Sequence, residues 1–299
     1  MGRVRVHPPL INTTDSGGEG EPLAEHPPDA TAEQRGTGRA LSPRVTRFVL
    51  GGAGVLTLLA VLEILPRTGL VNPRFTPPLS TVLRALFTEL IPGNAFWSSV
   101  GNTLLTWAIG LGVVIVSGLI TGVLVGAIPL LRTLTTTTVE FLRPIPSVAL
   151  IPLAIALFGI DRSATLLLVI YASFWQVFIQ VQYGVRDVDP VARDTARVYH
   201  FRRGTLVSKV IWPTMLPYAM TGFRLAAAVA LILTITGELI IGSDGIGRLI
   251  VAAQNAANYP QMYGLIIVTG LLGLAVNLVA RRMEQRLLRW HPSTRLEAV

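Results

Sequence analysis

Residues 101–130, GNTLLTWAIGLGVVIVSGLITGVLVGAIPL, lie within a 42-residue run from Leu90 to Leu131 that contains no Asp, Glu, Lys or Arg. About 20 apolar residues in a helix cross the hydrocarbon core of a bilayer, so this run predicts a membrane-spanning helix. The uncharged runs on either side predict five more. The six expected spans are about 47–65, 101–128, 137–158, 163–183, 218–241 and 262–283. The sequence therefore predicts an all-α polytopic membrane protein.

The composition excludes several classes of site. Only 14% of the residues are charged, against about 25% in an average soluble domain. The chain contains no cysteine, which excludes disulfides, thiolate nucleophiles and Cys-ligated metals. It also contains no G-x-x-x-x-G-K-[ST], H-E-x-x-H or G-x-S-x-G motif. We therefore expect a protein that is not an enzyme, with no cofactor, no metal site and no catalytic residues.

The distribution of Lys and Arg predicts the orientation. With the N-terminus in the cytoplasm, 19 of the 25 basic residues fall on the cytoplasmic side and five on the outer side, which predicts that both termini are cytoplasmic. The same distribution accounts for the net charge of +8, so no nucleic-acid partner is expected. Four regions follow: a Gly- and Pro-rich tail over 1–44, expected to be disordered; a first span and amphipathic segment over 45–94; the main transmembrane domain over 95–283; and a basic cytoplasmic tail over 284–299.

The loop between the fourth and fifth spans predicts an ordered helix on the cytoplasmic side. Asp189 followed by Pro190 is typical of a helix start, with Asp as N-cap and Pro in the first turn. Val191, Val198 and Tyr199 then share one helical face, and Arg193 and Arg197 lie elsewhere. Such a helix is expected to dock another protein. The alternative is a helix that lies on anionic membrane lipid.

Three features of the spans suggest where packing and transport occur. Gly118, Gly122 and Gly126 form a bare strip on one helical face, which favours close helix packing. Two prolines two residues apart free backbone carbonyls and predict irregular backbone beside a pathway. Two ionisable side chains in the fifth span are pathway candidates, or alternatively an interfacial arginine and an outer cap. The expected pathway residues are Pro144, Pro146, Ser147, Arg224 and Glu238.

Two strings, FLRPIPSVALIPLAI at 141–155 and YGVRDVDP at 183–190, resemble binding-protein-dependent ABC transporter permeases. The resemblance covers about residues 95–290 and is closest to the nitrate, sulfonate and taurine branch, which includes the aliphatic-sulfonate permeases. It implies a type I ABC permease fold in a bacterial cell membrane. It also implies two ATPase subunits, a second permease subunit in a homodimer or heterodimer, and an extracytoplasmic solute-binding protein. The implied function is ATP-driven import of a small anionic solute.

The resemblance assigns the loop over 186–212 to coupling with the ATPase. The implied coupling residues are Asp189, Val191, Arg193, Asp194, Ala196, Arg197, Val198, Tyr199 and His200. The family signature reads Glu-Ala-Ala with a Gly four residues after the second Ala, whereas this chain has Asp194-Thr195-Ala196 and His200. Glycine would permit a positive φ there, which His tolerates less well.

Two alternatives remain open. The first is the same class of transporter with another solute, such as a pyrimidine or another vitamin precursor. The second is a stand-alone secondary transporter, which would be expected to contain inverted repeats or several intramembrane acids; the sequence shows neither.

Overall fold

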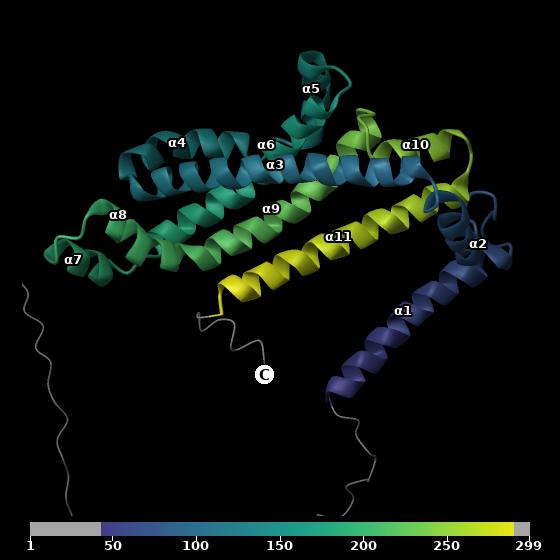
Figure 1. The fold of residues 1–299 in the computed structure, drawn as a ribbon, viewed down its shortest axis with the longest axis horizontal. Helices are drawn as coiled ribbons and strands as arrows, with labels where there is room; N and C mark the ends of the chain where they lie inside the picture. Colours follow the sequence, from purple (N-terminus) through teal and green to yellow (C-terminus); the bar gives the residue numbers. More distant parts are fainter. Residues whose placement is uncertain (1–42, 290–299) are drawn as a thin grey trace, which may run out of the picture. The chain divides into compact units, whose positions relative to one another are not determined.

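The computed structural model describes residues 43–289, which divide into two units, one ending at Ala53 and the other beginning at Gly54. The first unit contributes the start of α1. All regular structure in the described range is helical (Figure 1). The elements are α1 (Pro43–Arg67), α2 (Leu79–Ala85), η1 (Leu86–Leu90), α3 (Asn94–Ala127), α4 (Pro129–Leu142), η2 (Ser147–Leu150), α5 (Ile151–Phe158), α6 (Arg162–Arg186), α7 (Pro190–Val198), α8 (Arg203–Leu206), η3 (Val207–Ile211), α9 (Trp212–Ile240), α10 (Ile246–Asn255) and α11 (Tyr259–Leu287). The predicted tail over 1–44 lies almost wholly outside the described residues, as does the end of the 284–299 tail.

Five of the six expected spans are confirmed as single helices. The segments long and apolar enough to cross a membrane are Val49–Arg67, Asn94–Ala127, Arg162–Arg186, Gly204–Ile240 and Tyr259–Leu287. The expected span over 137–158 corresponds to two helical segments, and the irregular backbone predicted from the two prolines lies between them. These are α4 and the η2–α5 segment, bent by 84° at a short break. The break contains Pro144 and Pro146, which have no N–H to continue the helical hydrogen bonds.

In the second unit, α6 packs between α3 and α9, and glycines set the distance to α3. A Cβ added to Gly118 would lie 2.9 Å from the side chain of Val177, and one added to Gly122 would lie 2.8 Å from Val181. Gly126 faces Val185 in the same way. Every glycine of the predicted strip thus accommodates a valine of α6, and the prediction of close packing is confirmed.

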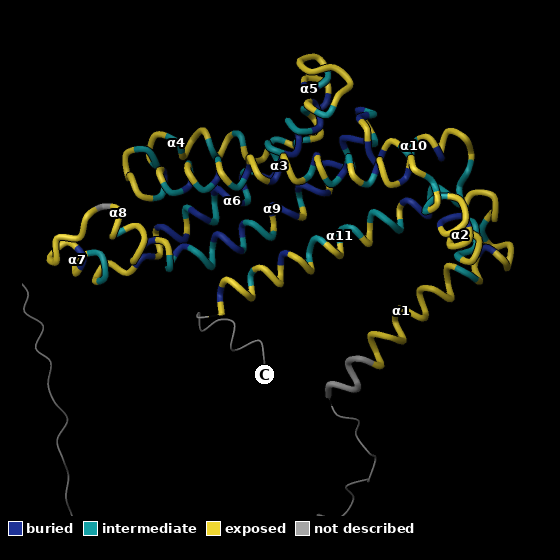
Figure 2. The backbone as a smooth tube through the Cα atoms, in the orientation of Figure 1, coloured by how far each residue is buried: buried dark blue, intermediate teal, exposed yellow. Residues whose placement is uncertain are grey.

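The contact between α6 and α9 uses the same principle. A Cβ added to Gly222 would lie 3.1 Å from the backbone oxygen of Gln176 in α6. A Cβ added to Gly237 would lie 2.6 Å from the side chain of Thr165. Gly184 of α6 in turn lies against Met215 and Tyr218. Figure 2 shows the buried residues concentrated where these helices meet, whereas α4 has no buried residue. The three helices therefore form the core that holds the other elements.

We predict that Gly122→Val destabilises the protein by about 1–3 kcal/mol, the usual range for overpacking. The added side chain would collide with Val181 and with the carbonyl oxygen of Phe178, which is backbone and cannot rotate away. The melting temperature of the purified protein in detergent measures the effect. Gly112→Ala is the matched control on the same helix, because nothing lies within 4 Å of a Cβ at Gly112. Equal melting temperatures for the two variants would contradict the packing argument.

Candidate functional site

The helix predicted in the loop after the fourth span is α7, and both of its ends are capped. The Asp189 carboxylate accepts a hydrogen bond from Val191 N at 2.8 Å. At the other end, Phe201 N donates to Ala196 O and His200 N donates to Arg197 O, each at 2.9 Å. This pair of bonds is a Schellman motif, which requires a left-handed residue between helix and loop. His200 takes that conformation with φ 51°, where the family signature has glycine.

One side of α7 is fixed to the rest of the fold. Ala196 is 4% exposed, and the Arg193 guanidinium donates to Val185 O near the end of α6 at 2.6 Å. Arg193, expected at a polar rim, thus links α7 to α6. Arg197 instead pairs with Asp194 at 3.1 Å on the surface.

The opposite side of α7 is apolar and open. Val191, Val198 and Tyr199 are 69%, 75% and 72% exposed. Together with Asp194 and Thr195 they line a shallow cavity of about 390 Å³. Figure 1 shows α7 at one end of the α3–α6–α9 bundle, and α5 and α10 near the other end. We call these the α7 end and the α10 end.

The break between α4 and α5 borders a second cavity, which is partly open and lies against α6 and α9. This cavity has a volume of about 240 Å³, and its polar lining includes Arg143, Ser147 and Gln176. Tyr171 of α6 donates a hydrogen bond to Leu142 O at 2.5 Å and so satisfies a carbonyl at the last turn of α4. The irregular backbone at Pro144 and Pro146 therefore lies beside a polar cavity. Of the expected pathway residues, Ser147 lines it directly.

The two intramembrane charges of α9 lie in separate environments. Arg224 pairs with Glu284 of α11 at 3.1 Å. Glu284, which was expected in the C-terminal tail, is thus the counterion of Arg224, although it lies 60 residues away in the chain. The pair places Arg224 at the surface between α9 and α11, with its side chain 38% exposed.

Glu238 lies at the α10 end and is only 1% exposed. Its Oε2 accepts hydrogen bonds from Thr103 Oγ1 at 3.0 Å and from Gly247 N at 2.9 Å. Thr103 in turn accepts a bond from Ile246 N at 2.9 Å. A Cβ on Gly245 would lie 2.0 Å from the Glu238 carboxyl carbon, so the glycine permits the loop to wrap around the carboxylate. Glu238 thus joins α9, α3 and the first turn of α10.

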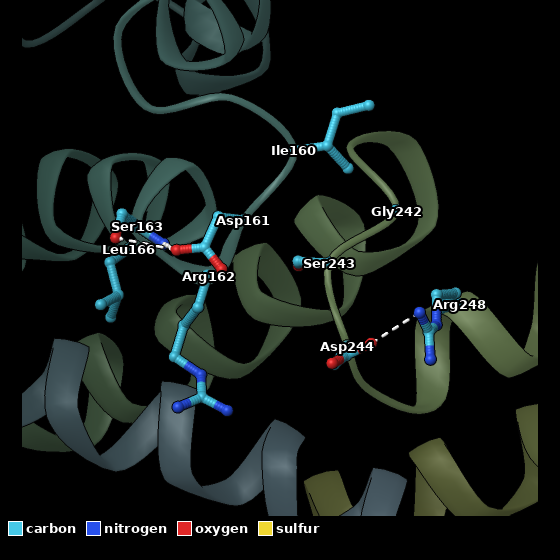
Figure 3. A pocket seen from close by; sticks show the side chains of 9 residues that line it. All are labelled: Ile160, Asp161, Arg162, Ser163, Leu166, Gly242, Ser243, Asp244 and Arg248. Carbon is cyan, nitrogen blue, oxygen red and sulfur yellow. Dashed lines mark hydrogen bonds and ion pairs between the residues drawn. The ribbon is translucent and has the colours of Figure 1, made fainter.

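A third cavity, with a volume of about 630 Å³, also lies at the α10 end (Figure 3). Its walls come from the α5–α6 turn and from the α9–α10 turn. Asp161 caps α6 and accepts from Ser163, and the backbone N–H groups of Arg162 and Ser163 lower the pKa of its carboxyl. Across the cavity, Asp244 pairs with Arg248 at 2.6 Å.

Comparison with known proteins agrees with this architecture. Residues 115–290 match the model of a protein family described as "Binding-protein-dependent transport system inner membrane component". The chain belongs to this family. It is a multi-pass permease subunit of an ABC importer of type I, a class that resides in the plasma membrane and works with ATPase and binding-protein partners.

Named relatives of the permease include two transport subunits. The putative aliphatic sulfonates transport permease protein SsuC of Bacillus subtilis (strain 168) is 29% identical over 239 residues, covering 79% of this chain and 85% of that protein. The taurine transport system permease protein TauC of Escherichia coli (strain K12) is 27% identical, covering 83% and 92%. A bacterial ABC transporter involved in the import of alginate shares the fold, with a TM-score of 0.57, 15% identity and coverage of 81% and 97%.

For Glu238 we predict a difference between two substitutions. Glu238→Ala removes the acceptor for the hydroxyl of Thr103 and the N–H of Gly247, which should destabilise the permease by about 2–4 kcal/mol. Glu238→Gln keeps an acceptor oxygen at the same position and should lose less than half of that. Melting in detergent compares them, with the exposed Glu140→Ala as control. A Glu238→Ala variant that melts with the wild type would show that the carboxylate does not hold α10.

Proposed function

We propose that this permease moves a small anionic solute, of the sulfonate type, from an external binding protein to the cytoplasm, and that α7 is the helix through which the ATPase drives it. The exposed apolar face of α7 is the observation that carries this proposal. A permease has no P-loop of its own, so the energy of ATP must arrive by mechanical contact.

The construction of α7 suits the transmission of force. A helix of nine residues is marginal in isolation, but this one is capped at both ends and bonded to α6. Its apolar side chains have no cover within the described residues. Apolar and aromatic side chains that fill pockets on a partner provide most of the binding energy at interfaces, commonly about 2 kcal/mol or more each. Val191, Val198 and Tyr199 are thus proposed as anchors in a groove of the ATPase.

A second permease subunit is proposed to cover α4. This helix carries Arg132, Glu140 and four consecutive threonines at 135–138, and none of its residues is buried. Charged groups at membrane depth avoid lipid and face protein or a water-filled cavity. A second copy of this chain, or a related permease chain, would enclose this face and complete the pathway.

The solute class rests on the relatives. Both are named for compounds that carry a sulfonate group, aliphatic sulfonates in one and taurine in the other. The polar cavity at the break contains an arginine and no acid, which is consistent with an anion. The α7 end, with both termini, is proposed to be cytoplasmic.

We predict that the double variant Val198→Ala and Tyr199→Ala loses the ATPase. It should no longer be retained on a tagged ATPase subunit, and solute-stimulated ATP hydrolysis should fall to the basal level, because two anchors are removed. Arg197→Ala is the control on the same helix, since an exposed ion pair contributes about 1 kcal/mol or less.

His200→Gly provides the complementary test. Glycine adopts a positive φ without steric cost, so this variant should retain both ATPase binding and coupling. If the double variant couples normally, α7 is not the dock. If the double variant instead no longer binds vesicles of anionic lipid, α7 is a helix that lies on the membrane.

The orientation can be tested because the chain lacks cysteine. We predict that Arg74→Cys reacts with a membrane-impermeant maleimide added to intact cells, whereas Arg202→Cys reacts only after the cells are opened. Both side chains are exposed, so accessibility depends on the side of the membrane. Labelling of Arg202→Cys in intact cells would reverse the proposed orientation.

A further inference from the structure

Arg143 lines two cavities that lie in series along α6. The first is the cavity at the break, beside Tyr171 and Gln176. The second has a volume of about 200 Å³ and extends along the facing sides of α4 and α6 to Arg132 and Arg186. Both cavities include Arg143, so together they line a path along α6 from the α4–α5 break toward the α7 end. We call it the α4–α6 track.

Arg143 lies near the middle of the membrane in this arrangement. The α6 residues beside it, 171–176, are at the centre of a helix that runs from Arg162 to Arg186. Arg132 lies in the first turns of α4, and Arg186 is the last residue of α6. The track therefore has one cation at mid-depth and two at its α7 end.

These three arginines are free to bind an anion. Among the described residues, no acid lies within ion-pair distance of Arg132, Arg143 or Arg186, and none of their guanidinium groups donates a hydrogen bond. The cavity residues include a single carboxylate, that of Glu140. The other polar groups that face the track are neutral, including Thr135, Thr136, Ser147, Gln176, Gln182 and Tyr183.

We propose that Arg143 is the anion-selecting group of the translocation pathway, and that Arg132 and Arg186 receive the anion at the exit. The proposal deepens the proposed function and rests on it for the solute class and the orientation. A guanidinium offers a planar pair of donors that matches the oxygens of a sulfonate. An arginine without an internal counterion binds an anion without first breaking an ion pair.

The remaining features of the track allow the anion to leave. Transport requires binding that is strong enough for entry and weak enough for release. Glu140 lies between Arg132 and Arg143 on α4 and lowers the positive potential there. Two further cations at the α7 end offer a second position, so that the anion moves from one arginine to the next.

The experiment uses the full importer, reconstituted in liposomes with its ATPase and binding protein, with ethanesulfonate and taurine as probes. Arg143→Cys should lower ATP-driven uptake about tenfold or more, the usual effect of losing a charge-assisted hydrogen bond. Treatment with the cationic reagent MTSET restores a positive charge at this position and should recover much of the uptake. The anionic reagent MTSES should leave uptake low. The wild-type permease contains no cysteine, so the wild-type importer measures any effect of either reagent on the partner subunits.

Two further variants separate charge from structure. Arg84→Cys, an exposed arginine outside the track, is the matched control and should transport normally with or without reagent. Glu140→Gln removes the only negative charge among the cavity residues, so it should lower the apparent KM for the probe and, by slowing release, the maximal rate of uptake. Retention on a tagged ATPase checks assembly for each variant. Should Arg143→Cys fail to assemble, Arg143→Lys, which keeps the charge, must transport better than Arg143→Gln.

The outcomes distinguish this proposal from the proposed function. ATP-driven uptake in the wild type, with the same uptake in assembled Arg143→Cys or Arg143→Gln, would overturn the role of Arg143 and leave the importer intact. Equal effects of MTSET and MTSES would show that size, not charge, matters at this position. No ATP-driven uptake of either probe by the wild-type complex would overturn the anion assignment itself, and this proposal with it.

Discussion

The close contact of α6 with α3 and α9 is the constraint on which the rest of the permease depends. Lipid is as apolar as the helices, so the hydrophobic effect does not press membrane helices together, and van der Waals packing must do so. Here glycines, which have no side chain, allow the helices to pack closely. Gly118 and Gly122 admit valines of α6 from one side, and Gly222 of α9 approaches the α6 backbone from the other. Without these glycines the helices would separate by roughly the width of a methyl group.

Both ends of this three-helix core carry a polar connection that uses the same helices. At the α7 end, Arg193 bonds to the carbonyl of Val185, one residue before the end of α6. At the α10 end, Glu238 of α9 joins α3 and the first turn of α10. The cavity at the break lies against α6 and α9 between these two connections. In the proposed mechanism, a displacement of α7 by the ATPase would be applied directly to α6, the helix that borders the cavity.

The sequence predicted what depends on local pattern. Length and apolarity identified the spans, the four-residue spacing identified the glycine strip, and Asp189 with Pro190 identified the start of α7. It did not predict the angle within the third span, because two prolines indicate a break but not a bend of 84°. Nor did it predict the partner of Arg224, since Glu284 is 60 residues away and only the packing of α9 on α11 brings the two together. The same reason hid the contact of Glu238 with Thr103, 135 residues apart.

The polar face of α4 is exposed in the single subunit. A residue exposed in one subunit meets one of three surroundings in the membrane: lipid, water or another subunit. Lipid is excluded for Arg143, at mid-depth, by the cost of an unpaired charge in hydrocarbon. Water without a second subunit is excluded as well, because an aqueous groove open to the bilayer would expose its polar walls to lipid along one side. The proposed second subunit would close a water-filled track in which the arginines stay charged and hydrated. In the proposed assembly, the charges that make a single subunit unsuited to lipid are the same charges that would suit the pathway to an anion.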